Sequence, residues 1–138
     1  VQITAPNHLF ELDAPATLPW HVDGPRLSQV LRNLLENAAK YAPADAGPVL
    51  ITLRVREQER ARWAAINVSD HGVGVADADL PRLFERTYRT ADAVTRGISG
   101  TGFGLYIART VVEAHGGQIW AEHAPHGGLA ICLELPSR

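Results

Sequence analysis

The chain has 138 residues, of which 46% are hydrophobic and 20% are charged, and it carries a formal net charge of -2. These values exclude global disorder and suit one compact domain rather than two. The near-neutral balance provides no broad basic surface, so we expect no nucleic-acid partner, and any recognition of phosphate has to be local.

Sulfur-containing residues are scarce in this chain. Cys132 is the single cysteine, which excludes an internal disulfide and a cysteine-cluster zinc site and fits a reducing, cytoplasmic location. It alternates with Ile131 and Leu133, which predicts either a core thiol or a neighbour on the polar face. The chain contains no methionine, as a fragment of a longer protein would. No apolar run reaches the roughly 18 to 20 residues of a membrane span, so we expect no membrane contact by this fragment.

A helix is predicted after a proline-containing start. Residues 1–22 hold three prolines among short apolar stretches, which predicts one or two short edge strands with loops. Asp23 can cap the helix that follows, and Pro25 suits its first turn. Apolar residues then recur at helical spacing until about Ala42-Pro43; they are Leu27, Val30, Leu31, Leu34, Leu35 and Ala38.

Alternating apolar residues predict a strand over residues 49–56 and an antiparallel partner over 63–69, joined by a charged connection at 57–62. On the second strand Ala64, Ile66 and Val68 share one face. The same parity predicts that Asp70 points inward.

Residues 71–102 contain little regular structure apart from a short helix expected around Leu80–Arg86. The glycines late in this segment favour mobility, and a long connection inside a compact domain is typical of a lid, here at about 75–101. A second helix is predicted from Phe103 to His115, then a hairpin of 118–123 with 129–135. We therefore expect one domain over 1–138, an α/β two-layer sandwich whose mixed sheet of about five strands has helices on one face.

Two amides and an ammonium lie on one stripe of the first helix. Asn33, Asn37 and Lys40 are spaced i, i+4 and i+7, and asparagine is unfavourable inside helices. An amide oxygen can ligate Mg²⁺ and a lysine can reach a phosphate. The alternative is an ordinary solvated flank of the helix.

Asp70-His71-Gly72-Val73-Gly74 places an acid and two glycines at the end of a strand. A simple turn is one interpretation. The other is a purine site, because an inward carboxylate needs a donor such as an exocyclic amine, and Gly72 and Gly74 would let a flat ring approach the backbone.

Gly100-Thr101-Gly102-Phe103-Gly104-Leu105 directly precedes the second helix. Backbone N–H groups at a helix start favour a polyphosphate. The segment is neither a P-loop nor a dinucleotide fingerprint, since the lysine and the glycine spacing of those motifs are absent.

Together these segments resemble the ATP-binding domain of sensor histidine kinases, a family related to gyrase-type topoisomerases, heat-shock chaperones and mismatch-repair ATPases. Four motifs occur in that family's order: residues 33–41 look like the N box, 70–74 like the first glycine box, 83–89 like the F box and 100–105 like the second glycine box. The resemblance implies the Bergerat-type ATP-binding fold.

The resemblance also implies site residues for ATP and Mg²⁺. Asn37 would ligate the metal, Asn33 would support it directly or through water, and Lys40 would touch phosphate. Asp70 would accept from the adenine amino group, Phe84 would anchor the lid, and Arg86 or Arg89 would approach the γ-phosphate. The remaining positions implied at the nucleotide are Tyr41, Gly72, Gly74, Thr101, Gly102, Phe103, Gly104 and Leu105. Phe103 departs from the family, which usually has leucine there.

The implied activity is protein-histidine kinase in two-component signal transduction, with the γ-phosphoryl group donated to a histidine on a separate dimerisation domain of the same parent. None of the six histidines has the family's acceptor context or a metal-site spacing. A response regulator would follow indirectly, the parent could be an inner-membrane sensor, and the fragment is expected to be monomeric. Two alternatives stay open: a clamp-type ATPase, disfavoured because Asn33 replaces the water-activating glutamate, and a nucleotide sensor without reaction.

Overall fold

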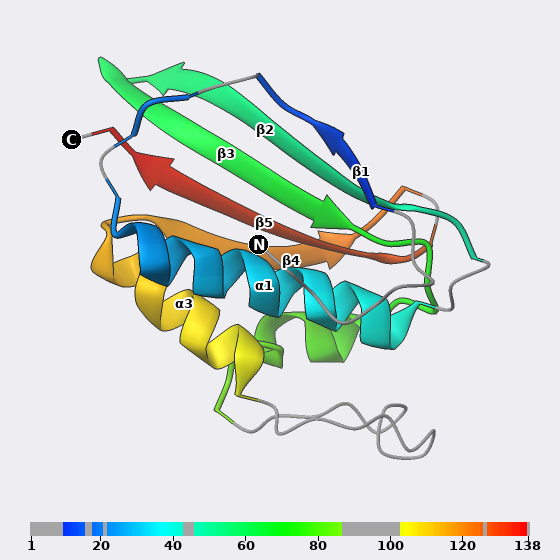
Figure 1. The fold of residues 1–138 in the computed structure, drawn as a ribbon. Coiled ribbons are helices and arrows are strands. Elements are labelled where there is room, and N and C mark those ends of the chain that lie inside the picture. Colours follow the sequence, from blue (N-terminus) through cyan, green and yellow to red (C-terminus); the bar gives the residue numbers. More distant parts are fainter. Residues whose placement is uncertain are drawn as a thin grey trace.

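A computed structural model describes residues 10–15, 18–20, 22–42, 46–86, 103–125 and 127–137. Within these residues one mixed sheet has the strand order β1-β2-β3-β5-β4, and β1 is parallel to β2 while the other pairs are antiparallel. The strands are β1 (Phe10–Asp13), β2 (Val49–Gln58), β3 (Ala61–Ser69), β4 (Gln118–His123) and β5 (Leu129–Pro136). Helices α1 (Gly24–Tyr41) and α3 (Gly104–Ala114) lie on one face of the sheet (Figure 1). The predicted two-layer sandwich is confirmed.

Helix α1 begins and ends as its sequence predicts. Asp23 is extended and its side chain accepts a hydrogen bond from the backbone N–H of Arg26 at 3.1 Å, which satisfies one of the free donors at the helix start. Pro25 occupies the first turn, and Ala42 leaves the helical conformation. The fully buried stripe of α1 consists of Val30, Leu34 and Ala38.

The β2–β3 hairpin is tighter than predicted. The two strands extend to Gln58 and Ala61, so only Glu59 and Arg60 form the turn, and both have positive φ, 54° and 66°. Two residues in the left-handed conformation give this turn the twist that a two-residue hairpin connection requires. The sequence carries no Asn-Gly signal here, which is why the connection was expected to be longer.

The core lies between the sheet and the two helices. Strand β5 is buried along nearly its whole length and pairs with both β3 and β4. Its residues Leu129, Ile131, Leu133 and Leu135 belong to the main apolar cluster. Since side chains alternate across a strand, the residues between them lie on the face without helices.

The helix-free face of the sheet carries a small buried cluster and an ion pair. Cys132 is buried there with Ala124 and Ala130 against Trp120, so the thiol lies in a satellite cluster rather than in the main core. Toward the end of β5, the Arg56 guanidinium donates to the Glu134 carboxylate at 2.7 Å. Arg56 thus reaches across β3, because β3 separates the strands that carry the two residues.

The predicted short helix at 80–86 is displaced. A 3-10 helix, η1, runs from Asp77 to Arg82. Asp77 and Asp79 favour a start at this point because acidic side chains stabilise helix N-termini. Pro81 lies inside η1 and cannot donate to a continuing helical ladder. Helix α3 matches its prediction to within a residue at each end, and Gly116 follows it with φ 80°.

Candidate functional site

The predicted inward carboxylate is present. Asp70 is 4% exposed, and its Oδ1 accepts hydrogen bonds from the backbone N–H groups of Gly72 at 2.9 Å and Leu129 at 3.1 Å. The bond to Gly72 closes a turn, as the simpler interpretation of this segment predicted. Among the residues that the structure describes, no donor lies within hydrogen-bonding distance of Oδ2. One carboxylate oxygen therefore remains for a ligand.

The glycines around Asp70 are needed for close backbone contacts. A Cβ at Gly72 would lie 2.4 Å from the Tyr41 carbonyl oxygen, and a Cβ at Gly74, where φ is 71°, would lie 2.5 Å from the Gly127 oxygen. We expected these glycines to admit a flat ring; they are required first by neighbouring segments of the protein itself. Gly128 was missed by the sequence reasoning, yet a Cβ there would lie 2.0 Å from the Asp70 carbonyl oxygen. The Gly127-Gly128 pair before β5 was the available signal.

Asn33, the first residue of the polar stripe of α1, contacts the start of α3. The Nδ2 group of Asn33 donates to the backbone oxygen of Gly104 at 3.1 Å. Asn37 follows four residues later, about 6 Å along the helix axis, and is partly buried, whereas Lys40 is exposed in the last turn. No side-chain hydrogen bond of Asn37 or Lys40 occurs within the described ranges. Both side chains are thus open to a ligand.

Helix α3 begins without a capping side chain among the described residues, and the N–H groups of a helix start favour an anion. The Arg86 guanidinium lies over the Phe103 ring, 5.4 Å from its centroid. Phe84 of the F box and Leu105 of the second glycine box are buried in the main core. Three predicted site residues, Arg89, Thr101 and Gly102, lie outside the described residues.

Comparison with known proteins identifies the family. Residues 22–138 match the model of the histidine kinase-, DNA gyrase B-, and HSP90-like ATPases. The chain belongs to this family. It is 41% identical over 115 residues to the sensor histidine kinase WalK of Bacillus subtilis, covering 83% of this chain and 18% of that protein. It is 38% identical over 127 residues to the signal transduction histidine-protein kinase BaeS of Escherichia coli, covering 92% of this chain and 26% of that protein.

Solved structures agree with this assignment. The mycobacterial sensor histidine kinase MprB superposes with a TM-score of 0.75 at 28% identity, covering 97% of this chain and 85% of that chain. Full-length ShkA in complex with AMPPNP superposes with a TM-score of 0.77 at 27% identity, covering 95% of this chain and 27% of that chain. The chain is the ATP-binding catalytic domain of the histidine kinase type, and it spans only 18% and 26% of the length of these two curated relatives.

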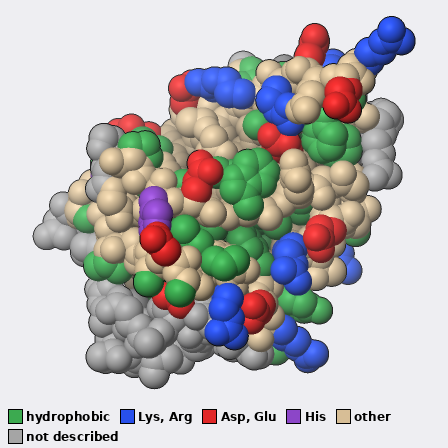
Figure 2. All heavy atoms as spheres, turned by 180° about the vertical axis from the view of Figure 1, so that it is seen from behind, with side chains coloured by type: hydrophobic (Ala, Val, Ile, Leu, Met, Phe, Trp, Pro, Cys, Tyr) green, Lys and Arg blue, Asp and Glu red, His purple; other side chains and the backbone are tan. Residues whose placement is uncertain are grey.

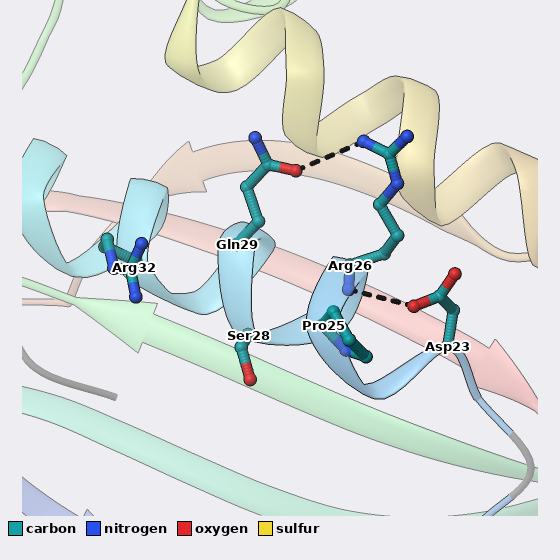
Figure 3. Close-up of a pocket in the computed structure, with 6 residues that line it drawn as sticks. All are labelled: Asp23, Pro25, Arg26, Ser28, Gln29 and Arg32. Carbon is teal, nitrogen blue, oxygen red and sulfur yellow. Dashed lines mark hydrogen bonds between the residues drawn. The ribbon is translucent and has the colours of Figure 1, made fainter.

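A separate hollow of about 500 Å³ lies at the other end of α1 (Figure 3). Its lining comes from the first turns of the helix, with Asp23, Pro25, Arg26, Ser28, Gln29 and Arg32. Arg26 donates to Gln29 within it at 3.4 Å. None of the residues predicted from the sequence to bind ATP lines this hollow.

The face of the ATPase domain that is seen from behind in Figure 2 shows no large field of one sign among the described residues. Seen from behind, basic and acidic side chains are interspersed among apolar ones (Figure 2). Within the described part of the chain, no three His, Cys, Asp or Glu side chains gather as a metal site. No helix in that part is long and apolar enough to cross a membrane.

Proposed function

We propose that this domain binds ATP with Mg²⁺ and donates the γ-phosphoryl group to a histidine on a separate dimerisation domain of its parent protein. One observation supports this most: contacts join all four sequence motifs although the chain separates them widely. Gly72 approaches the end of α1 at Tyr41, Asn33 is bonded to Gly104, and Arg86 stacks on Phe103.

The chemistry of each segment suits one part of the nucleotide. The adenine amino group would donate to Asp70, whose carboxylate has an oxygen to spare. Phosphate oxygens would bind the uncapped start of α3, at Gly104 and Leu105, and the Lys40 ammonium. A magnesium ion, which neutralises phosphate charge when bound, would be held by Asn37 with support from Asn33. AMPPNP, an ATP analogue, is present in the similar ShkA structure.

The proposed reaction is a transfer rather than a hydrolysis. A nitrogen of the partner histidine forms the new bond to phosphorus, the bond from the γ-phosphorus to the β–γ bridging oxygen breaks, and ADP leaves while the imidazole gives up its N–H proton. A response regulator then receives the group. Such transfers depend mainly on positioning and charge neutralisation, so the isolated domain, proposed to be a monomer, should bind nucleotide and turn over poorly. We further propose that it works on the cytoplasmic side of a membrane-bound parent.

The test compares wild type with Asn37→Ala and Asp70→Asn, using labelled ATP and a dimerisation domain as acceptor. We expect acid-labile label on the acceptor with wild type and none with Asn37→Ala. Asp70→Asn replaces an acceptor oxygen by a donor NH₂ group, so adenine-nucleotide affinity should fall about 10- to 100-fold, the value of a hydrogen bond to a charged group.

Two surface changes serve as matched controls. Asn67→Ala removes an exposed asparagine of β3, and Glu57→Gln neutralises an exposed acid at the end of β2. Both should label the acceptor as wild type does. If Asn37→Ala and Asp70→Asn label the acceptor as well as wild type does, the assignment of these residues to the nucleotide site is wrong.

A further inference from the structure

The two asparagines of the N-box segment differ in their surroundings. Asn37 makes no side-chain hydrogen bond to any described residue, whereas the amide of Asn33 is already engaged with the first residue of α3, donating from Nδ2 to the Gly104 oxygen at 3.1 Å. Metal support alone, the role implied by the family resemblance, does not account for this contact.

The chemistry of the contact fixes how the Asn33 amide is oriented. A backbone carbonyl can only accept, so the NH₂ group must face Gly104 and Oδ1 must point away from it. The Gly104 carbonyl has two lone pairs, so it can serve the helical ladder of α3 and Asn33 together. Asn33 can therefore hold α3 with one end of its amide and offer the other end to a cation or to water.

The contact decides where α3 begins relative to α1. Gly104 lies close to Asn33, since a Cβ at Gly104 would be 3.8 Å from the Asn33 Cβ. The other ends of the two helices are joined independently, because Asp23 N–H donates to His115 Nε2 at 3.0 Å. Near the predicted phosphate site, Asn33 is thus a polar link between the helices.

We propose that Asn33 is a positioning residue that holds the phosphate-binding start of α3 in register with α1. The inference rests on the proposed function and adds to it a role that does not require the metal. Loss of the Nδ2 donor lets the first turn of α3 shift away from α1, so its N–H groups no longer meet phosphates aligned with Asn37 and Lys40. The adenine side of the site, at Asp70, does not depend on this contact.

The test separates metal, phosphate and base effects in the 138-residue chain. Asn33→Ala removes the whole amide, whereas Asn33→Asp keeps an oxygen that ligates magnesium, loses the Nδ2 donor and adds a negative charge. Affinity for AMPPNP is measured by calorimetry with Mg²⁺ and with EDTA, and affinity for adenosine by NMR titration. Asn67→Ala is the matched control, and it should bind both ligands as wild type does.

We expect Asn33→Ala to bind AMPPNP about 5- to 10-fold more weakly, the value of one hydrogen bond, by the same factor with and without magnesium. Asn33→Asp should bind AMPPNP at least as weakly, because its added charge also repels the phosphates. Adenosine affinity should stay unchanged. A loss seen only with Mg²⁺, or wild-type affinity in Asn33→Asp, would show a metal role alone and overturn the proposal. Equal losses for adenosine and AMPPNP would indicate a general folding defect and overturn it too. A wild-type domain that binds neither ligand refutes the proposed function itself.

Discussion

Gly128→Ala tests whether the Asp70 carboxylate is held by tight backbone packing. A Cβ at this position would lie 2.0 Å from the Asp70 carbonyl oxygen and 2.6 Å from its Oδ1. Ordinary contact requires a separation larger by about 1 Å or more, since even hydrogen-bonded heavy atoms stay roughly 2.7 Å apart. Such a shift breaks the bonds that join Asp70 and Leu129, Asp70 N–H to the Leu129 oxygen at 3.0 Å and Leu129 N–H to Oδ1 at 3.1 Å.

The expected magnitude follows from those two bonds. One is neutral, worth about 1 kcal/mol, and one goes to a carboxylate, worth about 1.5 to 3 kcal/mol. The free energy of unfolding should therefore fall by about 3 kcal/mol, which lowers Tm by about 10 to 15 °C for a domain of this size. Urea denaturation and thermal scans measure both quantities.

Gly104→Ala is the matched control for this substitution. The added Cβ would be 3.8 Å from the nearest atom, an ordinary van der Waals distance, and alanine is the better helix former. Its stability should equal or exceed that of wild type. A Gly128→Ala protein within 0.5 kcal/mol of wild type would refute the packing argument.

Three further predictions concern other contacts. Burial, aided by the nearby Glu122 charge, raises the pKa of Cys132 to about 12, above the value near 8.5 of a free thiol. Between these two pH values only the unfolded chain loses the thiol proton, so the free energy of unfolding should fall by up to about 1.4 kcal/mol per pH unit. Urea denaturation of wild type and Cys132→Ala from pH 8 to 10 measures this difference. His115 donates from Nδ1 to a carbonyl of its own helix and accepts at Nε2, so His115→Phe should lower unfolding free energy in urea by about 1 to 2 kcal/mol. A double-mutant cycle of Arg86→Gln with Phe103→Leu, measured as free energies of unfolding, should give a coupling energy of about 0.5 to 1 kcal/mol. Additive effects of the two substitutions on unfolding would exclude the stacking of Arg86 on Phe103.

Local patterns were enough to predict most of the fold. The cap at Asp23, the proline after it and the apolar spacing defined α1, and strand parity predicted the burial of Asp70. The hairpin was predicted, but its two-residue turn was not, because Glu59 and Arg60 adopt left-handed conformations that ordinary turn signals do not indicate. That conformation is stabilised by the pairing of the long strands on either side.

The candidate site was harder to predict because its partners are distant in sequence. Asp70 is bonded to Leu129, and Asn33 to Gly104, across 59 and 71 positions. No local period encodes such pairs. The sequence showed that Gly72 mattered, but the reason, close approach to the end of α1 at Tyr41, depends on the folded arrangement of both segments.

The buried thiol on the helix-free face has a practical consequence. Cys132 is the sole cysteine of the chain, and it is 4% exposed with its ionisation suppressed, so alkylating reagents at neutral pH should leave it unmodified. A cysteine introduced at an exposed position would then be the one thiol that reacts with such a reagent. A spectroscopic probe attached there could follow nucleotide arrival in the otherwise native polypeptide.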